Sequence, residues 1–192
     1  MKTLVGLIGP AGCGKDTVSG LLKDKGFVRV ASADIMKEDL CRYLQINRKT
    51  LELYKNIELD VVERRPYVHR HLVCNFSIRR FLQEYGMDLR ERHGDNYWID
   101  LSVKSKIDEY DKIVVTDIRF ENEWNYIKDQ SGYMVYIDGR SALTDLTQVN
   151  HISEKLATSP TTSENADFVI DNSGTLDDLQ MQISKLMVDL SE

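Results

Sequence analysis

Short apolar runs alternate with amphipathic segments along the chain, and this alternation is typical of a parallel sheet whose strands are joined by helices. Near-continuous apolar runs indicate strands that are buried on both faces. The sequence therefore predicts an α/β fold in three layers, with a five-stranded parallel sheet flanked by helices. The five predicted strands are residues 3–8, 27–31, 112–116, 133–137 and 167–170.

The stretch between the second and third predicted strands shows helical patterns and is too long for a simple crossover. We therefore expect residues 35–111 to form a helical insert beside the sheet, within a single domain of residues 1–192. Residues 139–165 are polar and rich in Ser and Thr, so we expect a mobile lid segment with one short helix. Predicted helices cover residues 17–25, 51–63, 77–93, 95–110, 121–130 and 175–190, and one further helix places Ile35, Met36, Leu40 and Leu44 on one face.

The composition is ordinary for a globular protein: of 192 residues, 42% are hydrophobic and 29% are charged, which excludes disorder as the default state. The net charge of −6 argues against a nucleic-acid polymer as the partner. The three cysteines form no CxxC pair, so neither a disulfide framework nor a cysteine zinc site is expected. No signal peptide and no span of about 20 apolar residues is apparent, and we expect a cytoplasmic protein without membrane association. The sequence leaves a homodimer open.

Residues 9–17 read GPAGCGKDT and follow the first predicted strand. The segment matches the pattern GxxxxGK, in which glycines let main-chain N–H groups converge on phosphate oxygens at the start of a helix. A structural Gly-rich turn is the alternative, and the position between a strand and a helix argues against it. Lys15 is expected to reach the β- and γ-phosphates of a nucleotide. The predicted nucleotide ligands of this loop are Ala11, Gly12, Cys13, Gly14, Lys15, Asp16 and Thr17.

Three side chains are candidates for holding Mg²⁺, directly or through water. Asp16 follows Lys15 where the usual loop has a hydroxyl, and the hydroxyl of Thr17 comes one position later. This placement favours a small-molecule kinase over a GTPase switch. Asp117 ends the apolar strand 112–116, where a carboxylate can reach the metal. Capping of the next helix is the alternative interpretation of Asp117.

Several blocks of the sequence, in this order, resemble the deoxynucleoside monophosphate kinase family known from bacteriophages. The first blocks are the loop GPAGCGKDT, the segment ASADIMK at residues 31–37, and RRFLQ with YG and YW between residues 79 and 98. The later blocks are TDIRFENE at 116–123, HISE at 151–154 and DFVIDNSGTLDDL at 167–179. The resemblance covers most of the chain and implies a P-loop NTPase-type fold.

The resemblance implies that ATP, with Mg²⁺, phosphorylates deoxynucleoside 5′-monophosphates to diphosphates. Adjacent arginines diverge by about 100° on a helix, so one of Arg79 and Arg80 is expected to point away from the site. The alternative for Trp98 is a place in the core, and for Asp34 and Lys37 it is a helix cap and a solvated face. The implied catalytic residues are Lys15, Asp16, Arg79, Arg80 and Arg119. Beyond the loop, the implied ATP ligands are Arg119 and Arg140. The implied monophosphate ligands are Asp34, Lys37, Arg79, Gln83, Gly86, Trp98, Asp117 and Glu123.

Two other functions stay open on the sequence alone. A P-loop kinase of another small phosphorylated acceptor, such as phosphomevalonate, would share a similar loop and Asp-x-Arg segment. A non-catalytic nucleotide switch is the other alternative. Asp16 after Lys15 and the lack of an NKxD-type guanine-binding segment in the sequence argue against a switch.

Overall fold

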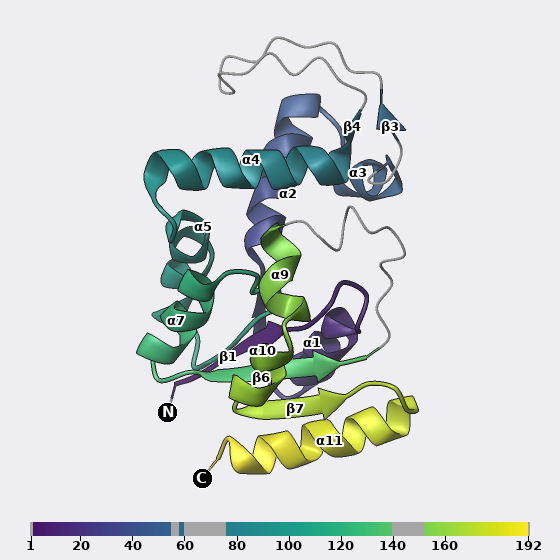
Figure 1. Ribbon diagram of the computed structural model, residues 1–192, viewed down its shortest axis with the longest axis vertical. Coiled ribbons are helices and arrows are strands. Elements are labelled where there is room, and N and C mark those ends of the chain that lie inside the picture. The colour runs from purple at the N-terminus through teal and green to yellow at the C-terminus, as the bar shows by residue number, and fades with distance from the viewer. Residues whose placement is uncertain (1, 55–57, 60–75, 140–151, 192) are drawn as a thin grey trace. The chain divides into compact units, whose positions relative to one another are not determined.

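The computed structural model describes residues 2–54, 58–59, 76–139 and 152–191, and the chain divides into two compact units. Unit 1 comprises residues 1–31 and 102–192, and unit 2 comprises residues 32–101 (Figure 1). Unit 2 thus begins at Ser32 and ends at Leu101, whereas the sequence predicts an insert over residues 35–111.

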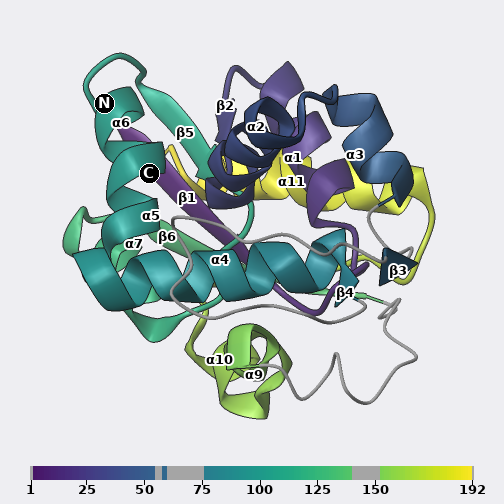
Figure 2. The same ribbon diagram turned by 90° about the horizontal axis from the view of Figure 1, so that it is seen from above.

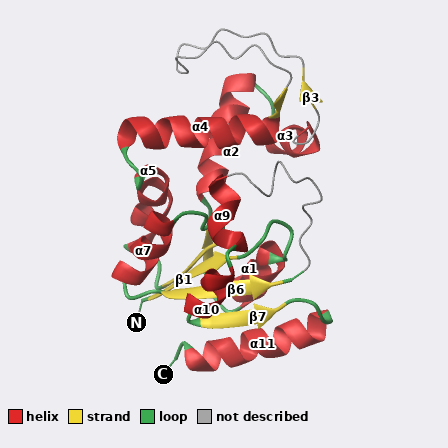
Figure 3. Ribbon diagram, in the orientation of Figure 1, coloured by secondary structure: helices red, strands yellow, loops and turns green. Residues whose placement is uncertain are grey.

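Unit 1 contains the predicted five-stranded parallel sheet (Figure 3). Its strands are β1 (Thr3–Ile8), β2 (Val28–Val30), β5 (Lys112–Val115), β6 (Tyr133–Asp138) and β7 (Phe168–Asp171). They lie in the order β2-β5-β1-β6-β7, and every neighbouring pair is parallel. In the central strand β1, Val5 pairs with Val114 on one side and with Tyr133 on the other. The buried character of β1 agrees with a strand covered on both faces.

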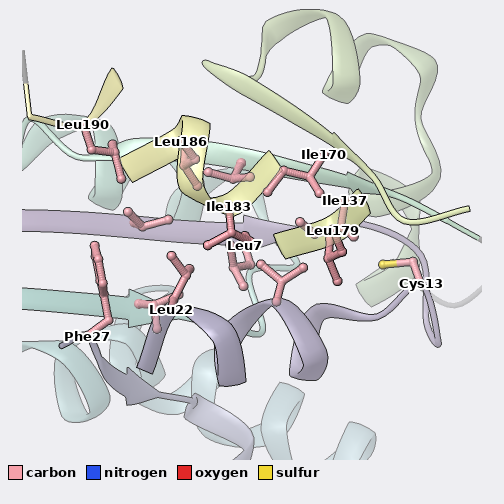
Figure 4. Packing of buried hydrophobic residues seen from close by; sticks show 14 residues of the cluster. Leu7, Cys13, Leu22, Phe27, Ile137, Ile170, Leu179, Ile183, Leu186 and Leu190 are labelled. Carbon is pink, nitrogen blue, oxygen red and sulfur yellow. The ribbon is translucent and has the colours of Figure 1, made fainter. Parts of the chain in front are cut away.

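Helices cover both faces of this sheet. On one face, α1 (Lys15–Asp24) and α11 (Leu176–Asp189) pack on the strands, and their apolar side chains point toward those of the sheet (Figure 4). On the other face, Ile127 of α7 (Glu121–Asp129) packs beside Gly6, where an added Cβ would lie 3.2 Å from its Cγ1. The buried cluster under α1 and α11 comprises Val5, Leu7, Cys13, Val18, Leu22, Phe27, Val114, Val135, Ile137, Ile170, Leu179, Ile183, Leu186 and Leu190.

The chain between β6 and β7 is more helical than expected. Two helices, α9 (Ile152–Thr158) and α10 (Pro160–Asn165), occur where the sequence analysis predicts a loop with one short helix. Pro160 begins α10, at a position where its missing N–H is not needed. Thr162 Oγ1 donates to the Leu156 carbonyl oxygen at 2.6 Å and joins the two helices. Residues 140–151 of the predicted lid lie outside the described residues.

Unit 2 is mainly helical. Its elements are α2 (Ser32–Leu44), α3 (Arg48–Tyr54), α4 (Ile78–His93) and α5 (Tyr97–Ile99), with the short strands β3 (Glu58–Leu59) and β4 (Phe76–Ser77). The axes of α2 and α4 run in different directions (Figure 2), and apolar residues of α2, α3 and α4 form one buried cluster. The antiparallel pair β3–β4 corrects the expectation of an insert without strands, and the helix predicted over 51–63 ends at Tyr54. The cluster comprises Leu40, Leu51, Ile78 and Phe81.

The helix predicted over residues 95–110 contains a π-turn. This turn, Asp100–Lys104, lies between α5 and α6 (Ser105–Ile107), and the boundary between the two units falls inside it, after Leu101. Hydrophobic periodicity does not distinguish such a turn from a regular helix. Within the described ranges, no helix has both the length and the apolar character that crossing a membrane requires.

Candidate functional site

The loop between β1 and α1 has a backbone that depends on glycine. Gly12 and Gly14 have φ values of 81° and 102°, in the left-handed region that residues with a Cβ rarely adopt. At Gly9 space is also limiting, because a Cβ there would lie 2.5 Å from the Ile137 carbonyl oxygen. α1 begins directly after the loop at Lys15, and the N–H groups of a first helical turn lack intrahelical acceptors. These donors and the positive end of the helix dipole suit an anion.

Lys15 folds back onto this loop. Its Nζ donates to the carbonyl oxygens of Gly9 at 2.6 Å and Pro10 at 2.8 Å, and it lies 3.6 Å from the Cys13 Sγ. Burial lowers the pKa of the Lys15 ammonium; the interaction with Cys13 opposes this change, and the Arg119 guanidinium adds to it. A phosphate would offer charged oxygens in place of these neutral carbonyls. The ammonium is therefore placed to exchange its present partners for an anion.

The two residues after Lys15 carry exposed oxygen atoms. The side chain of Asp16 is 91% exposed, and its Oδ1 lies 3.7 Å from Nη2 of Arg29 on β2. An ion pair this exposed contributes little to stability. Thr17 is also exposed in the first turn of α1. Both side chains remain accessible to a hydrated cation and offer the oxygen donors that Mg²⁺ prefers.

The segment after β5 holds three candidate residues at the carboxyl edge of the sheet, where ligands of α/β proteins usually bind. Asp117 and Arg119 are half-buried, whereas Glu123 is 5% exposed. Glu123 Oε2 accepts hydrogen bonds from the main-chain N–H groups of Arg119 at 2.8 Å and Phe120 at 3.2 Å. The Glu123 carboxylate thus caps the start of α7. Its role as a ligand of the monophosphate stays a prediction.

In unit 2, the polar residues of the ASADIMK segment are engaged with α3. Arg48 pairs with the Asp34 carboxylate, and its Nη1 donates to the Asp34 main-chain oxygen at 3.2 Å. Lys37 Nζ lies 2.5 Å from Glu52 Oε1, and Arg48 Nε lies 3.5 Å from the same oxygen. These four side chains form one charge network that links α2 to α3. Lys37 is 14% exposed in this network, so it is not the solvated residue of the alternative interpretation.

Helix α4 separates the two adjacent arginines. Arg79, Gln83 and Gly86 are four and three residues apart, so they share one face of the helix. Arg79 and Gln83 are half-buried, and Gly86 is buried. Arg80 is 57% exposed, and its Nε donates to Glu84 Oε1 at 2.8 Å on the surface of the same helix. The expected divergence of the pair therefore favours Arg79 as the functional residue and Arg80 as a surface residue.

Trp98 is a core residue of unit 2. Its side chain is 2% exposed, and its Nε1 donates to the Gly86 carbonyl oxygen at 2.9 Å. The rings of Tyr85 and Tyr97 have their centroids 5.8 and 4.9 Å from the ring of Trp98. The core alternative therefore describes Trp98, and direct packing on a sugar or base does not fit this geometry. Trp98 instead packs against α4 and binds its main chain at Gly86.

Comparison with known protein families bears on these residues. Residues 55–183 match the model of the deoxynucleotide monophosphate kinase family. The chain belongs to this family. It is also similar to a protein of Acanthamoeba polyphaga mimivirus that is provisionally named as a deoxynucleotide monophosphate kinase. The two are 26% identical over 197 residues, which cover 94% of this chain and 93% of that protein.

Solved structures share the fold of this deoxynucleotide monophosphate kinase family member. Dephospho-CoA kinase from Campylobacter jejuni has a TM-score of 0.53 at 16% identity, over 98% of this chain and 97% of that chain. Shikimate kinase from Acinetobacter baumannii, in complex with shikimate, has a TM-score of 0.53 at 18% identity, over 98% and 94% of the two chains. At such identities the likeness shows the fold alone. It confirms the P-loop kinase fold predicted from the sequence.

A P-loop kinase fold implies ATP and usually Mg²⁺, and unit 1 of this family member fits both. The glycine loop and Lys15 offer donors to a phosphate chain. No group of three or more His, Cys, Asp or Glu side chains that could hold a metal occurs in the part of the chain that the structure describes. Mg²⁺ does not need one, because proteins usually hold it by one or two oxygen ligands together with substrate phosphates. Asp16, Thr17 and Asp117 offer such ligands.

Two residues in these regions were missed by the sequence analysis. Asn172, predicted only as part of a turn, donates from Nδ2 to the Cys13 carbonyl oxygen at 2.9 Å across 159 residues of sequence. Arg48 binds Asp34, but neither its spacing nor its neighbours indicated this contact. A long-range contact between two polar residues leaves no periodic pattern in a single sequence. Arg140, the remaining predicted ATP ligand, lies outside the described residues.

Proposed function

We propose that this protein transfers the terminal phosphoryl group of ATP to a deoxynucleoside 5′-monophosphate and releases the diphosphate and ADP. One observation carries the proposal: the glycine loop of residues 9–14 and Lys15 stand at the carboxyl end of β1, with donors that suit a triphosphate. Membership of the deoxynucleotide monophosphate kinase family supports the choice of acceptor. Such a transfer needs positioning and charge neutralisation more than covalent help from the protein.

In the proposed donor site, the main-chain N–H groups of the glycine loop and of the first turn of α1 bind the phosphate chain, and the Cys13 N–H first has to leave the Pro10 oxygen to which it donates at 3.2 Å. Lys15 leaves the carbonyl oxygens of Gly9 and Pro10 and binds β- and γ-phosphate oxygens. Arg119 stabilises the negative charge of the transferring group. Bound Mg²⁺ supplies further neutralisation of the phosphate oxygens. The side chains that would hold it, directly or through water, are Asp16, Thr17 and Asp117.

In the proposed acceptor site, which belongs to unit 2, Arg79 binds the monophosphate. Gln83 lies one turn along the same face of α4, and its amide can both donate to and accept from a base edge. Gly86 follows on that face, where an added Cβ would lie 3.2 Å from the Met36 sulfur, so its lack of a side chain lets α2 and α4 pack closely beside the proposed site. Asp34 and Lys37 line the site in this proposal, so the substrate has to compete with the ion pairs that now hold them to α3.

The proposal is tested by measuring ADP release from ATP and Mg²⁺ with dAMP, dCMP, dGMP and dTMP and with their ribose counterparts. We expect turnover with at least one deoxynucleotide. Lys15→Ala is expected to lower kcat/KM by at least about a hundredfold, because one positioned donor to developing charge contributes at that scale. Lys23→Ala is the matched control, since Lys23 is an exposed lysine in the last turn of the same helix. A Lys15→Ala variant with nearly full turnover contradicts the proposal.

Other outcomes would separate the alternatives. ADP release that requires phosphomevalonate or another small phosphorylated acceptor, and not a nucleotide, would keep the donor site and replace the acceptor. Tight binding of GTP with no acceptor-dependent turnover would instead support a nucleotide switch.

A further inference from the structure

The carbonyl group of Cys13 is held by the end of the neighbouring strands. Asn172, directly after β7, donates from Nδ2 to the Cys13 oxygen at 2.9 Å. The main-chain N–H of Asn172 donates to the Asp138 oxygen at 2.6 Å, at the end of β6. Gly139 closes the other side, since a Cβ there would lie 2.6 Å from the Cys13 oxygen. The phosphate-binding loop is therefore tied to the carboxyl ends of β6 and β7.

This tie controls the orientation of one peptide group in the loop. The Cys13 carbonyl and the Gly14 N–H belong to the same planar peptide and point in opposite directions. Fixing the carbonyl toward Asn172 therefore aims the Gly14 N–H away from Asn172. Gly14 has a φ of 102°, and glycine has access to both signs of φ, so the backbone by itself does not prevent this peptide from turning over. A reversed peptide would present a carbonyl oxygen instead of an N–H to a bound anion.

The residues around Asn172 are themselves held in place. The Gln182 side chain accepts from the main-chain N–H of Asp171 at 2.9 Å and donates to the main-chain oxygen of Asp171 at 2.7 Å. The Ser173 N–H donates to the Asp171 carboxylate at 2.8 Å. Thr175 caps α11, with Asp178 Oδ2 accepting from its hydroxyl at 2.7 Å. Asn172 thus approaches the loop from a segment with little remaining freedom, so its hydrogen bond is formed before any ligand arrives.

We propose that Asn172 is a positioning residue for phosphate binding, which locks the Cys13–Gly14 peptide in the orientation that presents an N–H to the phosphate chain. The inference rests on the proposed function, because it assumes that this loop binds a triphosphate. It assigns Asn172 to the phosphate chain and not to the nucleoside. Inorganic tripolyphosphate, which has no nucleoside, is therefore the appropriate probe.

The experiment compares the binding of tripolyphosphate and of ATP, each with Mg²⁺, by calorimetry on the full-length protein. Asn172→Asp keeps the size of the side chain but turns an oxygen toward the Cys13 oxygen, and Asn172→Ala removes the donor without adding charge. We expect both variants to lower the affinities for tripolyphosphate and for ATP by the same factor, about tenfold or more. This is the scale of one hydrogen bond to a charged ligand. The KM of the monophosphate should stay unchanged. Asn125→Asp, an exposed position on α7, controls for the added negative charge.

Each outcome decides between distinct conclusions. A wild-type protein that binds neither ligand would refute the proposed function itself. Wild-type binding together with unchanged affinities in Asn172→Ala would refute the role of Asn172 and leave the proposed function intact. Weaker ATP binding with unchanged tripolyphosphate binding would place Asn172 on the nucleoside side and also refute the inference. Should Asn172→Asp fail to fold, Asn172→Ala provides the same comparison.

Discussion

Replacing Glu123 by Gln removes one negative charge from the first turn of α7 and keeps the size of the side chain. The Glu123 side chain is almost fully buried, and its Oε2 accepts from two main-chain N–H groups, those of Arg119 and Phe120. A Gln oxygen can accept the same bonds, but only as a neutral group. The substitution therefore isolates the contribution of the charge to the cap.

The magnitude follows from these two bonds. Hydrogen bonds to a charged partner contribute about 1.5–3 kcal/mol and neutral ones about 0.5–1.5 kcal/mol, so two bonds lose about 2 kcal/mol together. The favourable interaction of a carboxylate with the helix dipole adds about 0.5 kcal/mol, which is partly offset because a buried charge no longer has to be desolvated. For a chain of this size a loss of about 2 kcal/mol lowers Tm by about 4–8 °C.

The assay is thermal unfolding followed by circular dichroism, with Glu121→Gln as the matched control. Glu121 lies in the same first turn but is exposed, so its replacement should change the free energy of unfolding by less than about 0.5 kcal/mol. Because the Arg119 N–H is one of the two donors, we also expect Glu123→Gln to lower kcat at temperatures well below its unfolding transition. A Glu123→Gln protein with the Tm of the wild type would refute the cap, and lost activity with an unchanged Tm would instead point to direct contact with substrate.

Three further changes test other parts of the molecule. Arg79→Ala should raise the KM of the monophosphate at least about tenfold with little change in ATP affinity, while Arg80→Ala should leave both unchanged because that side chain forms an exposed pair on α4; equal effects of the two would contradict the division between them. Thr175→Ala removes the cap of α11 and should lower the free energy of unfolding, measured by urea titration, by about 1 kcal/mol. Turnover should stay unchanged. A loss of turnover without a loss of stability would be inconsistent with a capping role. Burial lowers the pKa of Lys15 from 10.5, whereas a bound phosphate favours its ammonium form. At alkaline pH, Lys15 therefore keeps its proton in the complex with ATP where it loses that proton in the free protein. ATP affinity should then fall as pH rises through that range, with proton uptake on binding seen by calorimetry in buffers of different ionisation enthalpy, and an affinity independent of pH there would show that the ammonium of Lys15 is not perturbed.

The parallel sheet could be predicted because its strands depend on a property that is local in sequence. Strands covered on both faces are apolar throughout, and β1 was predicted to the residue as Thr3–Ile8. The loop after it could be predicted equally well, since its glycines and Lys15 lie within one short segment of sequence. The order of the strands was not predicted, because it depends on which crossovers the helices make and not on any one segment.

The errors arose where structure depends on contacts between distant residues or on very short elements. The strands β3 and β4 have two residues each, too few to show alternation. The cap formed by Glu123 was not predicted, because the usual Ser or Thr of a capping box is replaced by Phe120 and the sequence pattern of a cap is absent. Asn172 was assigned to a turn, and its bond to Cys13 joins positions with no relation along the chain.

Lys15 in the proposed donor site and Lys37 in the proposed acceptor site are held in different ways, and this difference bears on how each would accept an anion. The ammonium of Lys15 is bonded to neutral carbonyl oxygens, beside the positive charge of Arg119, in a buried place that disfavours its charge. An incoming phosphate would replace neutral partners there by charged oxygens and would offset the cost of burying the ammonium charge. Lys37 is bonded to the Glu52 carboxylate, so a phosphate must displace an ion pair before it gains one. We therefore expect a phosphate to gain more free energy from a contact with Lys15 than from one with Lys37.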